Sequence, residues 1–264
     1  MILTVLISCI ALGSVVGFLA GLLGIGGGLI IVPALVYLLP MVGVSSDVVM
    51  PMALGTSLGA IVITSTSAAY AHHRKSNIPW PLARQLMILV AAGALIGAFI
   101  ADSLSTEALT GFFSFVVILL AAYMLLSINA SKERSLPATY VFQVLSFITG
   151  IISSLMGIAG GAILVPSLSF FGVPVRHAIG IATACGVMVA LFGSLGYIIT
   201  GFNLPNLPEL SLGYLYLPAL LGIVVSSSIF APVGVKYAGK LPVKTLKKFF
   251  AVFLIFVAIK MMMG

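Results

Sequence analysis

Charged residues are scarce in this sequence, and that scarcity excludes a soluble globular protein. Only 6% of the 264 residues are Asp, Glu, Lys or Arg, while 61% are hydrophobic. Soluble domains carry roughly 25% charged residues. Apolar runs close to the length of a membrane-spanning helix recur from end to end. We therefore expect an all-α, polytopic membrane protein with no appended soluble domain, in which helices satisfy their own backbone within the lipid.

Cysteine is equally rare, because the chain has only Cys9 and Cys185. Both lie within apolar runs, where an isolated cysteine behaves as a small packing residue. A disulfide framework is therefore excluded.

Acidic residues are fewer than basic ones, with five Asp and Glu against 12 Lys and Arg, so the formal net charge is +7. Such an excess can indicate a nucleic-acid partner. Here, however, eleven of the basic residues lie at one alternating set of helix ends, and Asp47, Asp102, Glu107 and Glu209 lie at the other. The positive-inside rule accounts for this pattern. We expect no nucleic-acid partner, a cytoplasmic (inner) membrane location, and both termini outside.

Ten apolar segments are predicted, of which the second and seventh are too short to cross a bilayer as helices. The first segment lacks a basic n-region, so we expect it to belong to the mature fold rather than to a signal peptide. The segments cover about residues 2–23, 29–40, 50–72, 80–101, 107–128, 138–156, 162–172, 177–200, 212–235 and 246–263.

A glycine-rich motif precedes each short segment. Residues 24–28 read Gly-Ile-Gly-Gly-Gly, and 133 positions later residues 157–161 read Gly-Ile-Ala-Gly-Gly. Glycine allows the backbone to turn and to approach a ligand closely, and the start of a helix leaves N–H groups without partners. In an apolar protein, two such motifs predict two halves of one site. The sequence leaves open whether the short segments are re-entrant or fully spanning.

The repetition extends over the whole chain and predicts two halves, residues 1–128 and 138–264. Each half holds five segments, an odd number, so the second half must enter the membrane from the opposite side. Glu107 and its counterpart Lys244, at a constant offset of 137, carry opposite charges as this requires. Inverted-topology repeats are typical of secondary transporters.

An anion is the ligand that two helix N-termini would favour, because their free N–H groups and positive dipole ends need acceptors. The hydroxyl groups of Thr56, Ser57 and Thr183 follow each motif in equivalent segments and could donate further hydrogen bonds. Equally, such hydroxyls could bond back to their own helix. Gly17, Gly93 and Gly97 are instead attributed to helix packing. The expected substrate-binding residues are Gly26, Gly27, Gly28, Leu29, Thr56, Ser57, Gly160, Gly161, Ala162 and Thr183.

Other chemistry finds little support in the sequence. Ser, His and Asp have no catalytic spacing, so we expect no enzyme, no cofactor and no metal. His72, His73 and His177 lie at membrane ends, where solvation explains them. The sequence allows a homodimer but does not decide the oligomeric state.

The duplicated glycine motif, each copy followed by Val-Pro at residues 32–33 and 165–166, together with Gly55-Thr56-Ser57, resembles the TauE/SafE family. The resemblance covers essentially the whole chain. It implies a permease of the cytoplasmic membrane that exports sulfite, a sulfonate or a related organic anion. The second copy departs from the pattern at Ala159 and at Ala182-Thr183-Ala184. An anion channel is the alternative, because it could use the same helix ends.

Overall fold

The computed structural model describes residues 2–23, 27–126, 139–205, 207–238 and 243–263. Its helices lie within a few residues of the predicted segments, apart from the start of the ninth, and confirm the all-α membrane fold. Four of them are long and apolar enough to cross a membrane: α3, α4, α5 and α8. The helices are α1 (Ile2–Leu23), α2 (Gly28–Leu38), α3 (Ser46–Arg74), α4 (Trp80–Asp102), α5 (Thr106–Leu126), α6 (Thr139–Met156), α7 (Gly161–Phe170), α8 (Val175–Gly201), α9 (Leu217–Ala238) and α10 (Val243–Met263), with a 3-10 turn η1 (Leu39–Val42) after α2.

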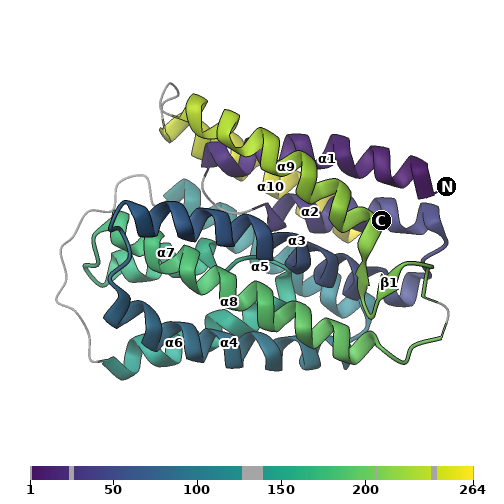
Figure 1. The fold of residues 1–264 in the computed structure, drawn as a ribbon, viewed down its shortest axis with the longest axis horizontal. Helices are drawn as coiled ribbons and strands as arrows, with labels where there is room; N and C mark the ends of the chain where they lie inside the picture. Colours follow the sequence, from purple (N-terminus) through teal and green to yellow (C-terminus); the bar gives the residue numbers. More distant parts are fainter. Residues whose placement is uncertain (1, 24–26, 127–138, 206, 239–242, 264) are drawn as a thin grey trace.

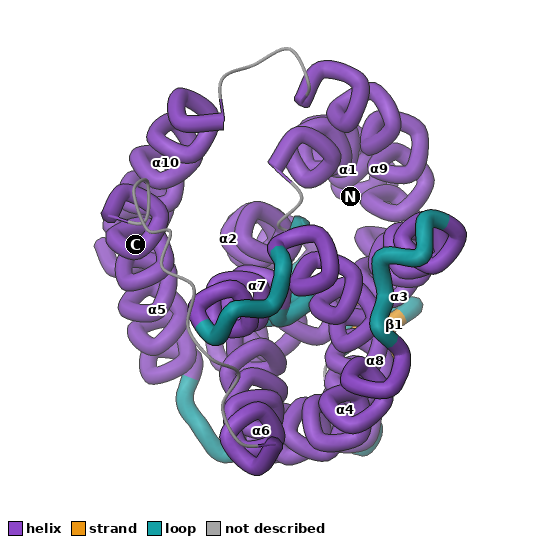
Figure 2. The backbone as a smooth tube through the Cα atoms, turned by 90° about the vertical axis from the view of Figure 1, so that its left-hand side faces the viewer, coloured by secondary structure: helices purple, strands orange, loops and turns teal. Residues whose placement is uncertain are grey.

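The helices form a bundle in which most of them run along one long axis, with the two chain ends at the same end of the bundle (Figure 1). The short helices α2 and α7 lie in the interior, and the other helices surround them (Figure 2). Since α2 has 11 residues and α7 has 10, each rises only about 15 Å. Neither short helix could cross a bilayer alone.

Close helix pairs account for the glycines that the sequence attributes to packing. Helix α1 packs on α9, where a methyl group at Gly17 would come to 2.6 Å from the Ser227 Cα. Helix α4 packs on α6, where a methyl group at Gly97 would come to 2.7 Å from the Ile151 carbonyl oxygen, and one at Gly93 would meet the Phe147 carbonyl. Small residues let these backbones touch, as is usual between membrane helices.

The core confirms the expected role of the cysteines. Cys9 on α1 and Cys185 on α8 are both fully buried, and both are free thiols. Each therefore acts as a small apolar residue at a helix contact.

One predicted boundary is wrong, because residues 212–216 form part of a β-hairpin and α9 begins only at Leu217. Strand β1 (Ser211–Leu212) pairs antiparallel with β2 (Leu215–Tyr216). The turn uses positive φ at Gly213 (+54°), and the chain enters the hairpin through Leu210 at +65°. Apolar composition alone does not reveal such a turn, because helix and buried hairpin are equally hydrophobic.

The hairpin is anchored in the bundle by polar contacts. Its residues Tyr214, Leu215 and Tyr216 are at most 5% exposed. The Tyr214 hydroxyl donates to the Asp102 carboxylate over 3.0 Å. Burial, followed by this hydrogen bond, raises the pKa of the Tyr214 hydroxyl, so it stays protonated and remains a donor. The hairpin thus ties the end of α4 to the start of α9.

Candidate functional site

The two glycine motifs, predicted from repetition alone to form one site, contact each other in the interior of the bundle. A methyl group at Gly28 would meet the carbonyl oxygen of Gly157 and would come to 3.0 Å from the Cα of Ile158. Helix α2 leads from this contact towards the end of the bundle where α3 begins. Helix α7 leads towards the opposite end, where α8 begins (Figure 1). Two helix N-termini therefore lie close together at the contact between the motifs.

Ser57 fixes the second motif against the first half of the chain. Its hydroxyl is fully buried and donates to the Gly157 carbonyl over 2.7 Å. Gly157 has a φ of +63°, and a methyl group there would come to 2.8 Å from Val32 and 3.1 Å from the Leu54 Cα. Only glycine satisfies both the backbone conformation and this close approach. The Ser57 hydroxyl is thus engaged in holding the motif.

The described end of the first copy, Gly27 and Gly28, is covered by neighbouring atoms. Gly27 is the residue before α2, and a methyl group on it would meet Val16 and come to 3.2 Å from Ile31. Gly28 is buried, and Leu29 is only 2% exposed. The predicted site residue Gly26 lies outside the described residues. In this conformation the start of α2 offers no open space to a ligand at Gly27 or Gly28.

The second copy is open at its last residue, Gly161, whereas the equivalent Gly28 is covered. Gly160 has a φ of +75° and turns the chain into α7. Gly161 is partly exposed, and apart from its chain neighbours and the backbone of its own helix, no atom lies within 4 Å of the position that a methyl group on it would take. Within the described part of the chain, the N–H groups of Gly161 and Ala162 donate no hydrogen bond. The start of α7 therefore presents two free donors beside open space.

Polar residues of α6 line the second copy, and the sequence analysis missed them. A methyl group added to Gly160 would lie 3.1 Å from the Ser153 hydroxyl oxygen and 3.5 Å from the Thr149 methyl group. At the repeat offset of 133, Thr149 corresponds to Val16, which contacts Gly27 in the first copy. The equivalent of Ser153 is Ala20. The pair Ser153-Ser154, one turn before the motif, is the sequence signal that distinguishes the two copies.

Helices α3 and α8 close the motif from another side. A methyl group added to Gly186 would lie 2.9 Å from the Ala159 carbonyl oxygen and 3.4 Å from the Ser65 hydroxyl oxygen. Ser65 belongs to the polar run 64–67, and its neighbours Thr64 and Thr66 bond back to carbonyls of their own helix. Ser65 is buried and, like the Ala159 carbonyl, lies against Gly186 of α8.

The two equivalent threonines have different partners. Thr56 is fully buried, and its hydroxyl oxygen accepts a hydrogen bond from the Tyr216 N–H over 3.0 Å. Thr183 is partly buried and donates to the Gly180 carbonyl of its own helix over 2.8 Å. Thr56 thus secures the β-hairpin, while Thr183 makes the back-bond common for hydroxyls in membrane helices. Their role as substrate donors stays a prediction.

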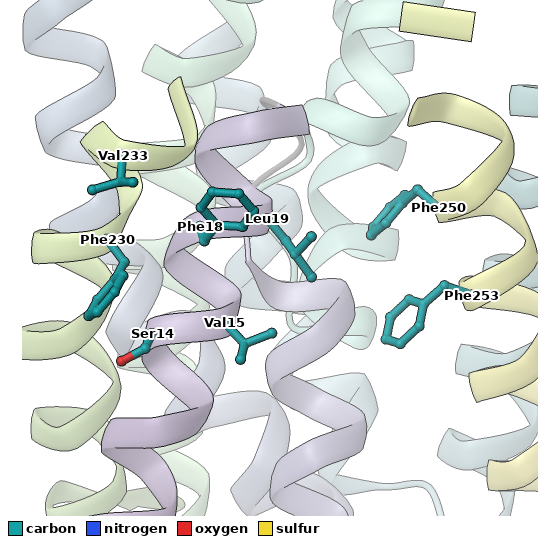
Figure 3. A pocket seen from close by; sticks show the side chains of 8 residues that line it. All are labelled: Ser14, Val15, Phe18, Leu19, Phe230, Val233, Phe250 and Phe253. Atoms are coloured by element: carbon teal, nitrogen blue, oxygen red, sulfur yellow. The ribbon is translucent and has the colours of Figure 1, made fainter. Parts of the chain in front are cut away.

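A large hollow in the described part of the structure lies elsewhere. It has a volume of about 520 Å³ and separates α10 from the pair α1 and α9 (Figure 3). Phe18, Phe230, Phe250 and other apolar side chains line it. Its polar lining residue, Ser14, donates to the Ile10 carbonyl. A hollow with this lining suits hydrocarbon rather than an anion.

The histidines at the α3–α4 connection bond to nearby polar groups. The Trp80 indole N–H donates to His73 Nδ1 over 3.1 Å, and the Asn77 amide lies 3.2 Å from His72 Nδ1. His177 is partly exposed near the start of α8. The hydrogen bond of His73 joins the end of α3 to the start of α4, and that of His72 joins it to the connection between the two helices.

Comparison with known proteins identifies related chains along nearly the whole length. The family described as "Sulfite exporter TauE/SafE" matches residues 9–261. A "Probable membrane transporter protein" from Haemophilus influenzae is 42% identical over 98% of both chains. A probable membrane transporter protein from Methanocaldococcus jannaschii is 27% identical, with 90% of this chain and 85% of the relative covered. No solved structure matches the chain.

Proposed function

Because the chain belongs to the TauE/SafE family of sulfite exporter-like membrane transporters, we propose that it exports a small oxyanion such as sulfite or a sulfonate. It acts as a secondary transporter of the cytoplasmic membrane. The substrate binds where the two glycine motifs meet, and backbone N–H groups at the helix starts hold its oxygens. No Lys or Arg is needed in the site, because the positive ends of helices favour an anion.

The observation that carries this proposal is the start of α7. Its free N–H groups at Gly161 and Ala162 lie beside open space, in the interior of a protein whose relatives are transporters. Backbone donors at membrane depth need acceptors, and an anion in transit supplies them. Ser57 supports this arrangement indirectly by holding Gly157 in place.

We further propose that residues 1–128 and 138–264 are inverted repeats that move against each other around the site. The pattern of helix contacts supports this relation. In such a repeat α1 corresponds to α6, and α4 corresponds to α9. The contact between α1 and α9 should then have a counterpart between α6 and α4. Both contacts are present in the structure. Rocking of such halves would expose the central site alternately to either side.

A carrier and a channel are distinguished by counterflow. In proteoliposomes preloaded with unlabelled sulfite, labelled sulfite added outside should accumulate transiently above its equilibrium level, because a carrier exchanges one bound anion for another. A channel conducts down the gradient and produces no overshoot. Equilibration without an overshoot, accompanied by an anion current, would identify the channel instead.

The orientation of the repeats leads to a labelling prediction. Asp102 lies at the end of α4 and Lys236 in the last turn of the equivalent helix α9, and both are exposed. Single cysteines at these positions, in a background without Cys9 and Cys185, should react with a membrane-impermeant reagent from opposite sides. We expect the Asp102→Cys variant to react from outside and the Lys236→Cys variant only after permeabilisation. Reaction of both from the same side would exclude the inverted repeat.

A further inference from the structure

Ser153 on α6 has a polar group that the fold leaves without a partner. The residue is fully buried, and its hydroxyl has no hydrogen bond within the described part of the chain. Leaving a buried hydroxyl unbonded is unfavourable, because the group loses its hydrogen bonds to water and gains none in the protein. In a helix a serine hydroxyl would ordinarily bond back to a carbonyl of the preceding turn, as Ser146 on the same helix does. The unused donor at Ser153 therefore needs an explanation.

The position of Ser153 supplies one. Its hydroxyl oxygen lies 3.1 Å from where a methyl group on Gly160 would stand, at the turn that opens α7. The free N–H groups of Gly161 and Ala162 follow directly. We propose that Ser153 and these two N–H groups form a three-donor subsite at the second glycine motif, which binds a tetrahedral oxyanion that carries no proton of its own.

The neighbouring carbonyl groups are partly engaged within the fold, which limits the acceptors that a proton on the anion would find. The Gly157 carbonyl already accepts from Ser57, and the Gly160 carbonyl accepts from the N–H groups of Ile163 and Leu164. The Ala159 carbonyl lies against Gly186. The Gly160 carbonyl therefore has both of its lone pairs engaged, and the Gly157 carbonyl has one of its two engaged.

No carboxylate replaces them within the described residues. The acidic side chains there are exposed and lie at helix ends or in the segment before the hairpin: Asp47, Asp102, Glu107 and Glu209. Hydrogenphosphate would bring an O–H into a subsite whose three protein groups all act as donors. A sulfonate offers three acceptor oxygens and no donor, which matches three donors.

This inference rests on the proposed function, and it also assigns unequal roles to the two motifs. Val16 occupies the place in the first copy that Thr149 takes in the second, and Gly28 is covered by Gly157. The first motif therefore acts as the surface against which the second is folded. The second motif binds the oxygens of the substrate.

The test measures anion affinity by titration calorimetry, and stability by detergent melting, for the wild type and two serine variants. Ser153→Ala should weaken methanesulfonate binding about ten-fold or more, while the melting temperature stays equal or rises because an unbonded hydroxyl is removed. Ser154→Ala is the matched control. Ser154 is also fully buried and its hydroxyl is also unbonded. That hydroxyl faces Gly193 of α8, however, where it lies 3.1 Å from the position that a methyl group on Gly193 would take. Ser154→Ala should leave affinity unchanged.

The outcomes separate the inference from the function on which it rests. The wild type should bind methanesulfonate at least about ten-fold more tightly than phosphate, because the O–H of hydrogenphosphate would face a subsite made of three donors. Equal affinity for the two anions, or wild-type affinity in the Ser153→Ala variant, would overturn the three-donor subsite and leave anion transport standing. A wild-type protein that binds no oxyanion would overturn both.

Discussion

Gly161→Ala is expected to abolish most anion binding without lowering the melting temperature, whereas Gly28→Ala should lower the melting temperature sharply. The two glycines hold equivalent places in the repeat, but their surroundings differ. A methyl group on Gly161 meets no atom within 4 Å outside its chain neighbours and its own helix backbone, and it would project into the space beside the free N–H groups. A methyl group on Gly28 would collide with the Gly157 carbonyl and crowd Ile158.

The physical reason is the difference between filling a ligand site and overpacking a core. Overpacking costs about 1–3 kcal/mol, and more where the obstacle is backbone that cannot move aside. Alanine at the start of a helix carries no such penalty and has a better helix propensity than glycine. The loss of affinity in Gly161→Ala should therefore exceed about ten-fold, because the methyl group excludes the ligand from its donors.

Gly97→Ala provides the control for a pure packing defect, since a methyl group there would come to 2.7 Å from the Ile151 carbonyl. Gly28→Ala should resemble this control in melting temperature. Calorimetric affinity and detergent melting for all three variants form the measurement. A Gly161→Ala protein that melts like Gly97→Ala but binds the anion as the wild type does would show that the start of α7 is scaffold.

Thr56→Val and Thr183→Val should also have opposite consequences. Valine at Thr56 removes the oxygen that accepts the buried Tyr216 N–H, so the N–H is left unbonded at a cost of about 1–3 kcal/mol. The melting temperature should fall. Valine at Thr183 removes only a back-bond to the Gly180 carbonyl and should change stability little.

Anion affinity then shows whether either hydroxyl reaches the substrate. If Thr183 exchanges its back-bond for the substrate during transport, Thr183→Val should weaken binding by about ten-fold or more, because hydrogen bonds to charged groups contribute about 1.5–3 kcal/mol. Thr56→Ser is the matched control for the hairpin, since it keeps the oxygen. Unchanged affinity in both valine variants would assign the two threonines to structure alone.

The sequence alone sufficed to predict the number and places of the helices. A helix buried in lipid needs a long run of apolar residues, and such runs are visible in the sequence itself. Repetition within the sequence likewise predicted that the motifs at 24–28 and 157–161 belong together. The β-hairpin at 211–216 escaped this reasoning. Its apolar residues satisfy the same hydrophobic pattern as a helix, and its turn depends on Gly213 and Leu210 adopting positive φ.

The candidate site was predicted in part. Gly160, Gly161 and Ala162 lie where two helix N-termini meet, as expected from the glycines and the short helices that follow. The sequence treated both motifs as equal, because a repeat carries no information about which copy is covered. Ser153 was missed because its importance depends on an unbonded hydroxyl, which no local pattern reveals.

The sequence by itself therefore determined the membrane class, the helices and the pairing of the two motifs, since all three follow from composition and repetition. Only the tertiary structure decided that Gly28, in the first motif, is covered and that the equivalent Gly161, in the second, is open. That difference arises from contacts between residues distant in the chain: Gly28 against Gly157, and Ser57 bonded to the same carbonyl. Close packing between helices fixes which backbone donors are covered, and covered donors cannot bind an anion.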